Sequence, residues 1–257
     1  MPHATSPAAK ASGEPASERS PIFRLLAYLV LPFMYLLGRY RILGGEKLPR
    51  TGAFVLAPNH NSEIDPLVMG VAMWKLGRMP RYLTKASLFT VPVLGWFLRK
   101  TEQVPVQRGG AARDNGPLAI AERLADRGLG VIIYPEGSLT RDPELWPMRG
   151  KTGAVRMALE ADVPLIPVAH WGAQLILPRY AKRISLFPRK NVTIAYGDPV
   201  DLSAYRGRNL DASELAAATN LLMNAITALV ADLRGEIPPA QRWDPNQHNQ
   251  RETGRFE

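Results

Sequence analysis

A histidine followed five residues later by an aspartate, His60 and Asp65, is the pair in this sequence best suited to proton transfer. An imidazole changes its charge near neutral pH, so a histidine oriented by a carboxylate can act as a general base. On a straight helix, residues five apart point about 140° away from each other. We therefore expect the chain to turn between them, with His60 in a loop and Asp65 in a first helical turn.

The residues around Asp65 predict this turn. Ser62-x-x-Asp65 resembles the start of a capping box, and Pro66 suits the first turn of a helix. Short motifs are weak on their own, and this one also fits a loop histidine beside a helix-capping aspartate. Other segments must decide between the two interpretations.

A second polar segment follows the apolar run 130–134. It contains Glu136, Gly137, Ser138, Thr140 and Arg141. A glycine permits close approach of the backbone, hydroxyls can bind a polar head group, and an arginine can bind phosphate through two hydrogen bonds. A capping turn with solvated charges is the structural alternative.

Further candidate ligands for an anionic group are basic. Arg149 and Lys151 precede an expected helix, whose first backbone amides would also favour an anion. Arg108 follows an expected strand. The other residues that we expect to contact a substrate are Asn59, Ser62 and Lys85.

The elements that must position these residues alternate between strand and helix patterns. The expected strands are 53–57, 104–106, 130–134, 165–169 and 192–196, with a further short candidate at 41–43. The expected helices are 67–76, 88–98, 117–127, 152–161 and 212–233. This order indicates an α/β fold with a mainly parallel central sheet flanked by helices. In such a sheet the site lies beyond the carboxyl ends of the strands, which would bring His60, Arg108 and 136–141 together.

The N-terminal part divides into two segments. Residues 1–20 are rich in Ala, Ser and Pro and predict a disordered tail. Residues 25–38 are uncharged but broken by Pro32, and the run is shorter than the ~20 residues of a spanning helix. We expect residues 21–41 to form a membrane-associated helical segment that embeds without crossing the bilayer. A buried core helix is the alternative.

Length and composition narrow the class of protein. The chain has 257 residues, 46% of them apolar, which suits one sizeable domain, expected at 42–235, with a polar and loosely held tail at 236–257. The absence of cysteine excludes disulfides, thiolate metal sites and cysteine nucleophiles. Of the other histidines, we expect His3 and His248 to be spectators and His170, at a strand end, to be structural. We expect no metal site.

The net charge of +9 is high enough to suggest an anionic binding partner, although a basic solvated surface would also account for it. Residues 66–101 and 163–197 carry basic side chains among apolar and aromatic ones, with no Asp or Glu. Such windows favour an anionic partner, either a membrane surface or nucleic acid. No nucleic-acid-binding module is recognisable, and the apolar run 25–38 would have no use there, so we expect a membrane and no nucleic acid.

Four segments together resemble a known family. Asn59-His60-x4-Asp65, then Arg108, then Pro135-Glu136-Gly137-Ser138, and then Val-Pro-Leu-Ile-Pro-Val at 163–168 resemble the four ordered blocks of the glycerolipid acyltransferases. The 1-acyl-glycerol-3-phosphate acyltransferase branch is the most similar, and the resemblance covers roughly 43–197. It implies that His60 deprotonates the free hydroxyl of a lysophospholipid, which attacks the thioester of acyl-CoA or acyl-carrier protein. Asp65 would orient the imidazole, and the product would be phosphatidic acid.

The resemblance also implies the binding residues. Glu136, Gly137 and Ser138 would belong to the acceptor pocket, and Arg108 and Arg141 would hold the phosphate. Here Leu139 and Thr140 separate Ser138 from Arg141, an insertion relative to the family pattern, so Arg149 or Lys151 could replace Arg141. Gln107 stands where the family usually has an acid.

The resemblance implies no metal and no bound redox cofactor, with acyl-CoA or acyl-carrier protein as the acyl donor substrate. The resemblance implies a monotopic or peripheral enzyme on the cytoplasmic face of the cell membrane, with acyl-carrier protein as a second candidate partner. The alternatives are the same chemistry on glycerol 3-phosphate or a different lyso-lipid, or a non-enzymatic basic membrane-binding protein that kept the fold.

Overall fold

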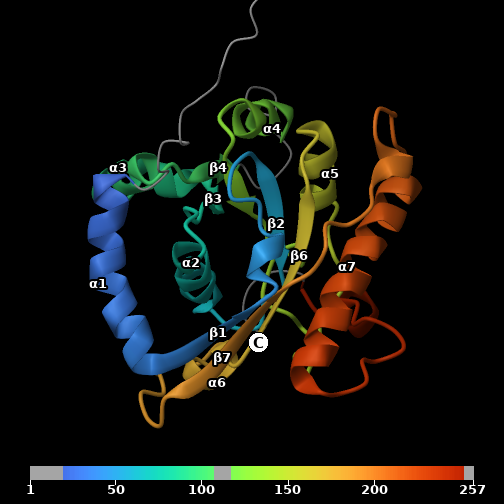
Figure 1. Cartoon of the computed structure of the whole chain (residues 1–257). Helices are drawn as coiled ribbons and strands as arrows, with labels where there is room; N and C mark the ends of the chain where they lie inside the picture. Colours follow the sequence, from blue (N-terminus) through green and yellow to red (C-terminus); the bar gives the residue numbers. More distant parts are fainter. Residues whose placement is uncertain (1–19, 107–116, 252–257) are drawn as a thin grey trace, which may run out of the picture.

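The computed structural model describes residues 20–106 and 117–251, in which helices cover both faces of a central sheet (Figure 1). The tail expected at 1–20 therefore lies almost wholly outside the described residues, as does Arg108. The sheet has five strands in the order β1-β7-β6-β2-β5. Their bounds are β1 (Gly38–Leu43), β2 (Phe54–Pro58), β5 (Gly130–Ile132), β6 (Leu165–Trp171) and β7 (Lys190–Tyr196).

Strand direction agrees with the expected fold class. The pairs β1–β7, β6–β2 and β2–β5 are parallel, and β6–β7 is antiparallel. A second parallel pair, β3 (Leu83–Lys85) and β4 (Val104–Val106), continues the sheet beyond β5 through a bridge between Tyr82 and Ile132. The prediction of an α/β fold with a mainly parallel sheet is confirmed.

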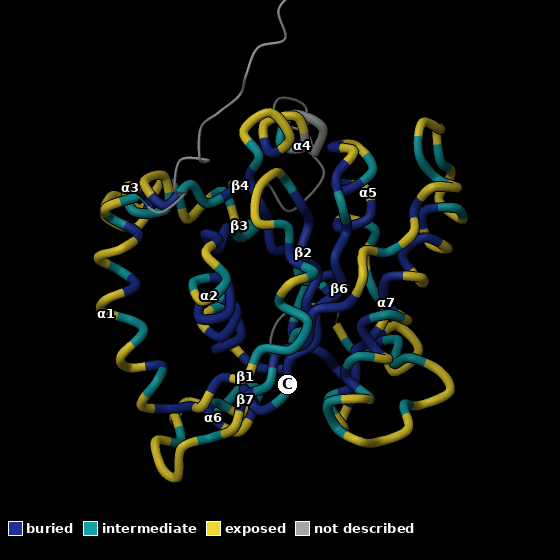
Figure 2. The backbone as a smooth tube through the Cα atoms, in the orientation of Figure 1, coloured by how far each residue is buried: buried dark blue, intermediate teal, exposed yellow. Residues whose placement is uncertain are grey.

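Consecutive residues of β2 explain why a continuous apolar run forms this central strand. Phe54 and Leu56 belong to the hydrophobic cluster on the side of α1 and α2, whereas Val55 belongs to the cluster on the side of α5 and α7. Side chains along a strand alternate between the two faces of a sheet, so both faces of β2 are buried (Figure 2).

The helices divide between the two faces. On one face lie α1 (Pro21–Leu37) and α2 (Asp65–Lys75), with α3 (Pro92–Lys100) near the start of α1 (Figure 1). The remaining helices are α4 (Pro117–Asp126), α5 (Gly153–Glu160), α6 (Ala173–Ile176) and α7 (Ala212–Arg234). Short 3-10 helices are η1 (Gly45–Lys47), η2 (Ala86–Thr90), η3 (Ser203–Tyr205) and η4 (Pro245–His248).

Two predicted helices that contain a proline differ from their expected form. The run expected to be broken at Pro32 is one helix, α1, with Pro32 inside it and Ser20 capping its start. The helix expected at 88–98 is instead η2 followed by α3. Val91 is extended (φ −73°, ψ 122°), as expected for a residue before proline, and Pro92 opens the new helix.

Within the described residues, α7 is the one helix long and apolar enough to cross a bilayer. It begins with a complete capping box at Asp211 and Glu214. Its buried residues Leu222, Met223 and Ile226 belong to the hydrophobic cluster on this face of the sheet. We therefore describe α7 as a core helix.

The prediction of a loosely held C-terminal tail is wrong for the described residues up to 251. The carbonyl of Trp243 accepts a hydrogen bond from the Arg149 N–H at 2.9 Å, and the Trp243 ring stacks on His248 with 3.5 Å between centroids. Arg242 donates to the Asn220 side chain of α7 at 2.7 Å. These contacts hold the segment against the body of the protein.

Candidate active site

The candidate base lies in the loop between β2 and α2. His60 Nδ1 lies 2.9 Å from Asp65 Oδ2, and Asp65 is the first residue of α2. The expected turn and contact between the two residues are therefore present. Since a carboxylate only accepts hydrogen bonds, Nδ1 carries the proton and His60 Nε2 is left as an acceptor.

Asp65 is fully buried and is held by the backbone of its own loop. Its Oδ2 accepts hydrogen bonds from the N–H groups of Asn61 and Ser62, both at 2.8 Å. The Ser62 hydroxyl does not cap the Asp65 amide but donates to the Leu177 carbonyl at 2.5 Å. Half of the expected capping box is therefore formed, and these two bonds hold one oxygen of the carboxylate beside His60.

The loop after β5 supports the His60 backbone. The Glu136 carboxylate accepts the His60 N–H at 2.9 Å and the Met148 N–H at 3.0 Å. The His60 carbonyl in turn accepts the Thr140 N–H at 2.7 Å. As expected, the ends of the neighbouring strands β2 and β5 bring His60 and Glu136 together.

Glu136 is fully buried, so the structure gives its carboxylate a scaffold role beneath His60. Burial raises the pKa of the Glu136 carboxyl to about 8, against the lowering effect of the Met148 and His60 N–H groups and of Thr140. Its expected contact with the acceptor stays a prediction. Asn59 and Ser62 are likewise buried and bonded to protein groups.

A cavity of about 1010 Å³ opens beside His60. The His60 side chain is 16% exposed, and its ring stacks on Tyr134 with 4.1 Å between centroids. Lys151, Gly137 and Lys85 also line the cavity. These are the expected substrate-binding residues that the structure brings together with His60.

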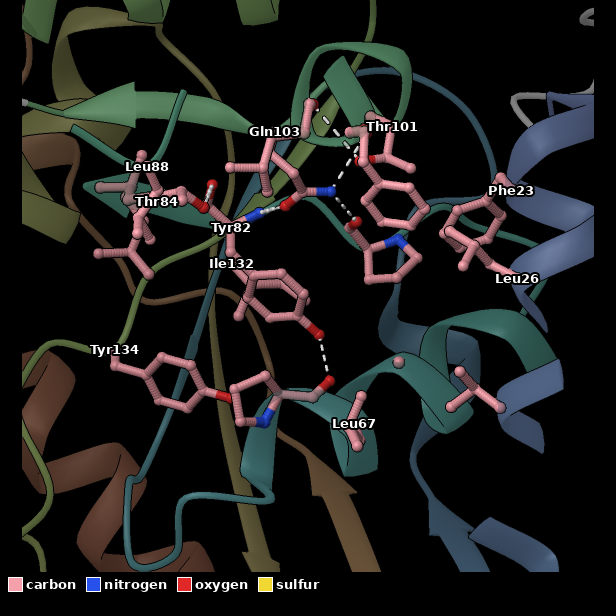
Figure 3. A pocket seen from close by; sticks show the side chains of 18 of the residues that line it. Phe23, Leu26, Leu67, Tyr82, Thr84, Leu88, Thr101, Gln103, Ile132 and Tyr134 are labelled. Carbon is pink, nitrogen blue, oxygen red and sulfur yellow. Dashed lines mark hydrogen bonds between the residues drawn. The ribbon is translucent and has the colours of Figure 1, made fainter. Parts of the chain in front are cut away.

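Away from His60, the cavity is lined mainly by apolar side chains of α1, α2, α3 and β5 (Figure 3). The Tyr82 side chain, directly before β3, reaches α2, where its hydroxyl donates to the Pro66 carbonyl at 2.5 Å. The Gln103 side chain accepts the Tyr82 N–H at 2.9 Å and donates to the Thr101 carbonyl at 3.1 Å. These bonds satisfy polar groups at the cavity edge and leave the interior apolar.

The remaining expected anion ligands are placed elsewhere. Arg141 is 1% exposed and does not line the cavity. Arg149 is 51% exposed and pairs with Asp244 of the C-terminal segment at 3.4 Å. The Ser138 hydroxyl, also outside the cavity lining, donates to the Leu139 carbonyl at 3.3 Å. Among the described basic residues proposed from the sequence, the geometry favours Lys151 and Lys85.

Two aromatic rings at this site were not expected to take part. Tyr134 stacks on His60, and His170 lies behind Asp65 with its Nε2 at 3.5 Å from Asp65 Oδ2. Tyr134 follows β5 and His170 lies near the end of β6, and both strands pair with β2. The expectation that the site lies at the carboxyl ends of neighbouring strands, which located Glu136, would therefore have indicated these two residues as well. Within the described residues, no group of three or more His, Cys, Asp or Glu side chains is placed to hold a metal ion.

Comparison with known proteins shows the family to which the chain belongs. A family model described as Acyltransferase matches residues 39–171. A 1-acyl-sn-glycerol-3-phosphate acyltransferase from Bacillus subtilis is 30% identical over 211 residues, which cover 81% of this chain and 96% of that protein. A chloroplastic enzyme of the same description from Brassica napus is 29% identical over 185 residues. The aligned part is 70% of this chain but spans only about half, 51%, of the Brassica protein.

A solved structure shares the fold. The crystal structure of the 1-acyl-sn-glycerophosphate acyltransferase PlsC from Thermotoga maritima superposes with a TM-score of 0.58, covering 84% of this chain and 81% of that one. The sequence identity is 21%, so this likeness establishes the fold alone.

Proposed function

This chain belongs to the acyltransferase family and is an acyltransferase, and from that premise we propose that it acylates the free hydroxyl of 1-acyl-glycerol 3-phosphate to give phosphatidic acid. The observation that carries the proposal is the His60–Asp65 pair at the edge of a large apolar cavity with Lys151 beside it. The relatives from Bacillus subtilis and Brassica napus, both described as 1-acyl-sn-glycerol-3-phosphate acyltransferases, support this choice of acceptor.

In this mechanism His60 is the general base. Its unprotonated Nε2 takes the proton from the acceptor hydroxyl as the oxygen attacks the thioester carbonyl. The Asp65 carboxylate stabilises the imidazolium that forms. When the tetrahedral intermediate collapses, the carbon–sulfur bond breaks, and the imidazolium returns the proton to the thiolate of the leaving carrier.

The cavity supplies room for an acyl chain. Its volume of about 1010 Å³ is at the upper limit of the ~300–1,000 Å³ usual for small-molecule sites. Its apolar lining would receive the hydrocarbon, while Lys151 and Lys85 at the polar edge would attract the acceptor phosphate. The carrier of the acyl group is CoA or acyl-carrier protein.

We propose that the cavity side of the protein embeds in the cytoplasmic leaflet of the membrane. Leu25, Tyr28 and Leu29 of α1 are all more than 60% exposed, and on α3 Val93 is 80% exposed. Both helices also line the cavity, and they lie at the same edge of the molecule in Figure 1. Apolar residues flanked by Arg99 and Lys100 are typical of interfacial helices on anionic lipid.

The direct test is thioester consumption with palmitoyl-CoA and 1-acyl-glycerol 3-phosphate, comparing the wild type with His60→Ala. Loss of a positioned general base should lower kcat at least ~10²-fold. His248→Ala, which removes an exposed histidine stacked on Trp243, is the matched control and should keep wild-type activity. A folded His60→Ala variant with full activity would refute the assignment.

Exchange of substrates tests the acceptor and the donor. If the wild type is inactive with palmitoyl-CoA and 1-acyl-glycerol 3-phosphate, the next substrates to test are glycerol 3-phosphate, other lyso-lipids and acyl-carrier protein thioesters. Turnover with another acceptor alone would replace the proposed substrate but keep the chemistry. Failure of every thioester would favour a non-enzymatic membrane-binding protein and reject the proposed reaction.

A further inference from the structure

A second histidine lies behind the candidate base. His170, the sixth residue of β6, is fully buried, and its Nε2 is 3.0 Å from the Asn59 carbonyl oxygen. A carbonyl oxygen only accepts hydrogen bonds, so the His170 proton is on Nε2. Within the described chain, His170 Nδ1 has no hydrogen-bond partner.

The same N–H of His170 faces the acid that orients His60. His170 Nε2 lies 3.5 Å from Asp65 Oδ2, the oxygen that meets His60 Nδ1 at 2.9 Å. Two imidazoles therefore face one buried carboxylate oxygen. The other oxygen, Oδ1, has no hydrogen-bond partner among the described residues. The orientation of Asp65 therefore depends on the donors around Oδ2, which also include the N–H groups of Asn61 and Ser62.

His170 contributes a dipole here and not a second positive charge. Burial lowers the pKa of the His170 imidazole, the nearby His60 lowers it further, and Asp65 and the Asn59 bond raise it. A neutral His170 leaves the charge of Asp65 available to the imidazolium that forms on His60 during transfer.

Connecting β2 to β6 does not require the imidazole. The His170 backbone N–H donates to the Asn59 side-chain oxygen at 2.8 Å, and the Asn59 side-chain N–H donates to the His170 carbonyl at 3.2 Å. Both bonds use the backbone of His170 and would survive a change of its side chain. The ring contacts therefore call for another explanation.

We propose that His170 is a positioning residue: its Nε2–H holds the Asn59 carbonyl and orients Asp65 Oδ2, so that Asp65 keeps His60 Nε2 directed at the acceptor hydroxyl. This role rests on the proposed function, in which His60 is the base. The two can nevertheless be separated, because the state of the His60 ring is measurable without turnover.

The experiment compares His170→Gln with His170→Leu. A glutamine amide can place an N–H near the position of the imidazole Nε2, whereas leucine fills similar space without a donor. We expect the Leu variant to lose about 10- to 100-fold in kcat, the loss typical when a hydrogen-bonding partner that orients a metal-ligating histidine is changed, with KM for both substrates nearly unchanged. The Gln variant should recover most of that loss.

Nitrogen-15 NMR of the histidines supplies a readout that a merely structural role would not change. In the wild type and the Gln variant, His60 should show a protonated Nδ1, and in the Leu variant a mixture of both tautomers. Circular dichroism and thermal unfolding verify that both variants are folded.

Several outcomes would overturn the proposal. These are a folded Leu variant with wild-type kcat and His60 tautomer, or Gln and Leu variants with equal losses. If the wild type transfers no acyl group but the His60 tautomer still depends on the donor at position 170, the positioning role stands and the proposed reaction fails.

Discussion

At the scale of single residues, the Glu136 carboxyl has a pKa well above that of a free carboxyl. Burial raises its pKa from 4.5 to about 8. Between these values the folded state holds a proton at Glu136 that the unfolded state has lost. Its contribution to the free energy of unfolding is therefore fully present below about pH 4.5, falls as the pH rises toward 8, and levels off above that.

Glu136→Gln should remove this part of the pH dependence, because an amide of the same size does not ionise. We expect the free energy of unfolding of the variant, measured by urea titration in detergent from pH 5 to 9, to fall less steeply than that of the wild type. Glu46→Gln, which removes an exposed carboxylate, should keep the wild-type slope. Equal slopes in the Glu136 variant and the wild type would contradict a buried, protonated Glu136.

Lys151 and Arg149 give a matched pair of basic residues. Lys151 lines the cavity, whereas Arg149 pairs with Asp244. A hydrogen bond to a charged group contributes ~1.5–3 kcal/mol, so Lys151→Met should raise KM for the lyso-lipid about 10-fold or more. Arg149→Met should leave KM near the wild-type value. The opposite ranking, from initial rates at varied acceptor concentration, would place the phosphate near Arg149.

Sequence spacing predicted the His60–Asp65 contact because both residues belong to one short loop. It did not predict that Glu136 supports the His60 backbone or that His170 faces Asp65. Those contacts join residues that are 76 and 105 positions apart, and they depend on which strands become neighbours. Side-chain type alone also could not tell which of Lys151 and Arg149 lines the cavity. Arg149 instead contacts the C-terminal segment around Trp243, and the position of that segment is not evident from the sequence.

At the scale of elements, α1 and α3 are expected to act together at the membrane. Each apolar side chain that enters the bilayer contributes ~1.5–3 kcal/mol, so a charged replacement should weaken binding severely. We expect Val93→Asp combined with Trp96→Asp to release the protein at high salt from vesicles of phosphatidylglycerol and phosphatidylethanolamine, measured by sedimentation. The wild type should stay bound.

Leu221→Asp is the control for this experiment. Leu221 is also exposed, but it lies on α7, on the opposite side of the molecule from α1 (Figure 1). Its variant should sediment like the wild type. Salt-resistant binding by the α3 double variant would show that α3 does not contribute to the anchor.

The elements differ in how well the sequence predicted them. The strands β2, β6 and β7 were found because long apolar runs identify strands buried on both faces. The short strand β3 was missed because Thr84 and Lys85 are polar and only its pairing with β4 makes it a strand. The prediction that Pro32 breaks the first helix is wrong, because α1 continues through it, whereas Pro92 starts a new helix.

At the scale of the whole molecule, the cavity between the α1–α2 layer and the β3–β4 edge should limit acyl length. Gly70 of α2 lines it, and a Cβ added there would meet only the Tyr82 hydroxyl, 4.0 Å away. Gly70→Phe should therefore fill cavity space, and we expect kcat/KM for palmitoyl-CoA to fall at least ~10-fold relative to octanoyl-CoA.

Gly70→Ala adds one carbon in the available space and should keep the wild-type chain preference, since nothing must shift. The measurement is a competition between the two thioesters in one vessel. Equal losses for both chain lengths in Gly70→Phe would place the acyl chain outside this part of the cavity. The existence of the cavity could not be predicted from sequence, because residues from α1 to Lys151 all contribute to it.

The position of α1 has a consequence for how the reaction must be measured. One side of this helix lines the cavity through Phe23, Leu26 and Val30, while Leu25 and Leu29 on its other side are exposed. If that outer side embeds as proposed, the acceptor diffuses within the plane of the bilayer. The concentration that sets the rate is then its mole fraction in the membrane and not its concentration in solution. Diluting the lyso-lipid with inert phospholipid would then slow the enzyme even at constant bulk concentration, which is the behaviour called surface dilution.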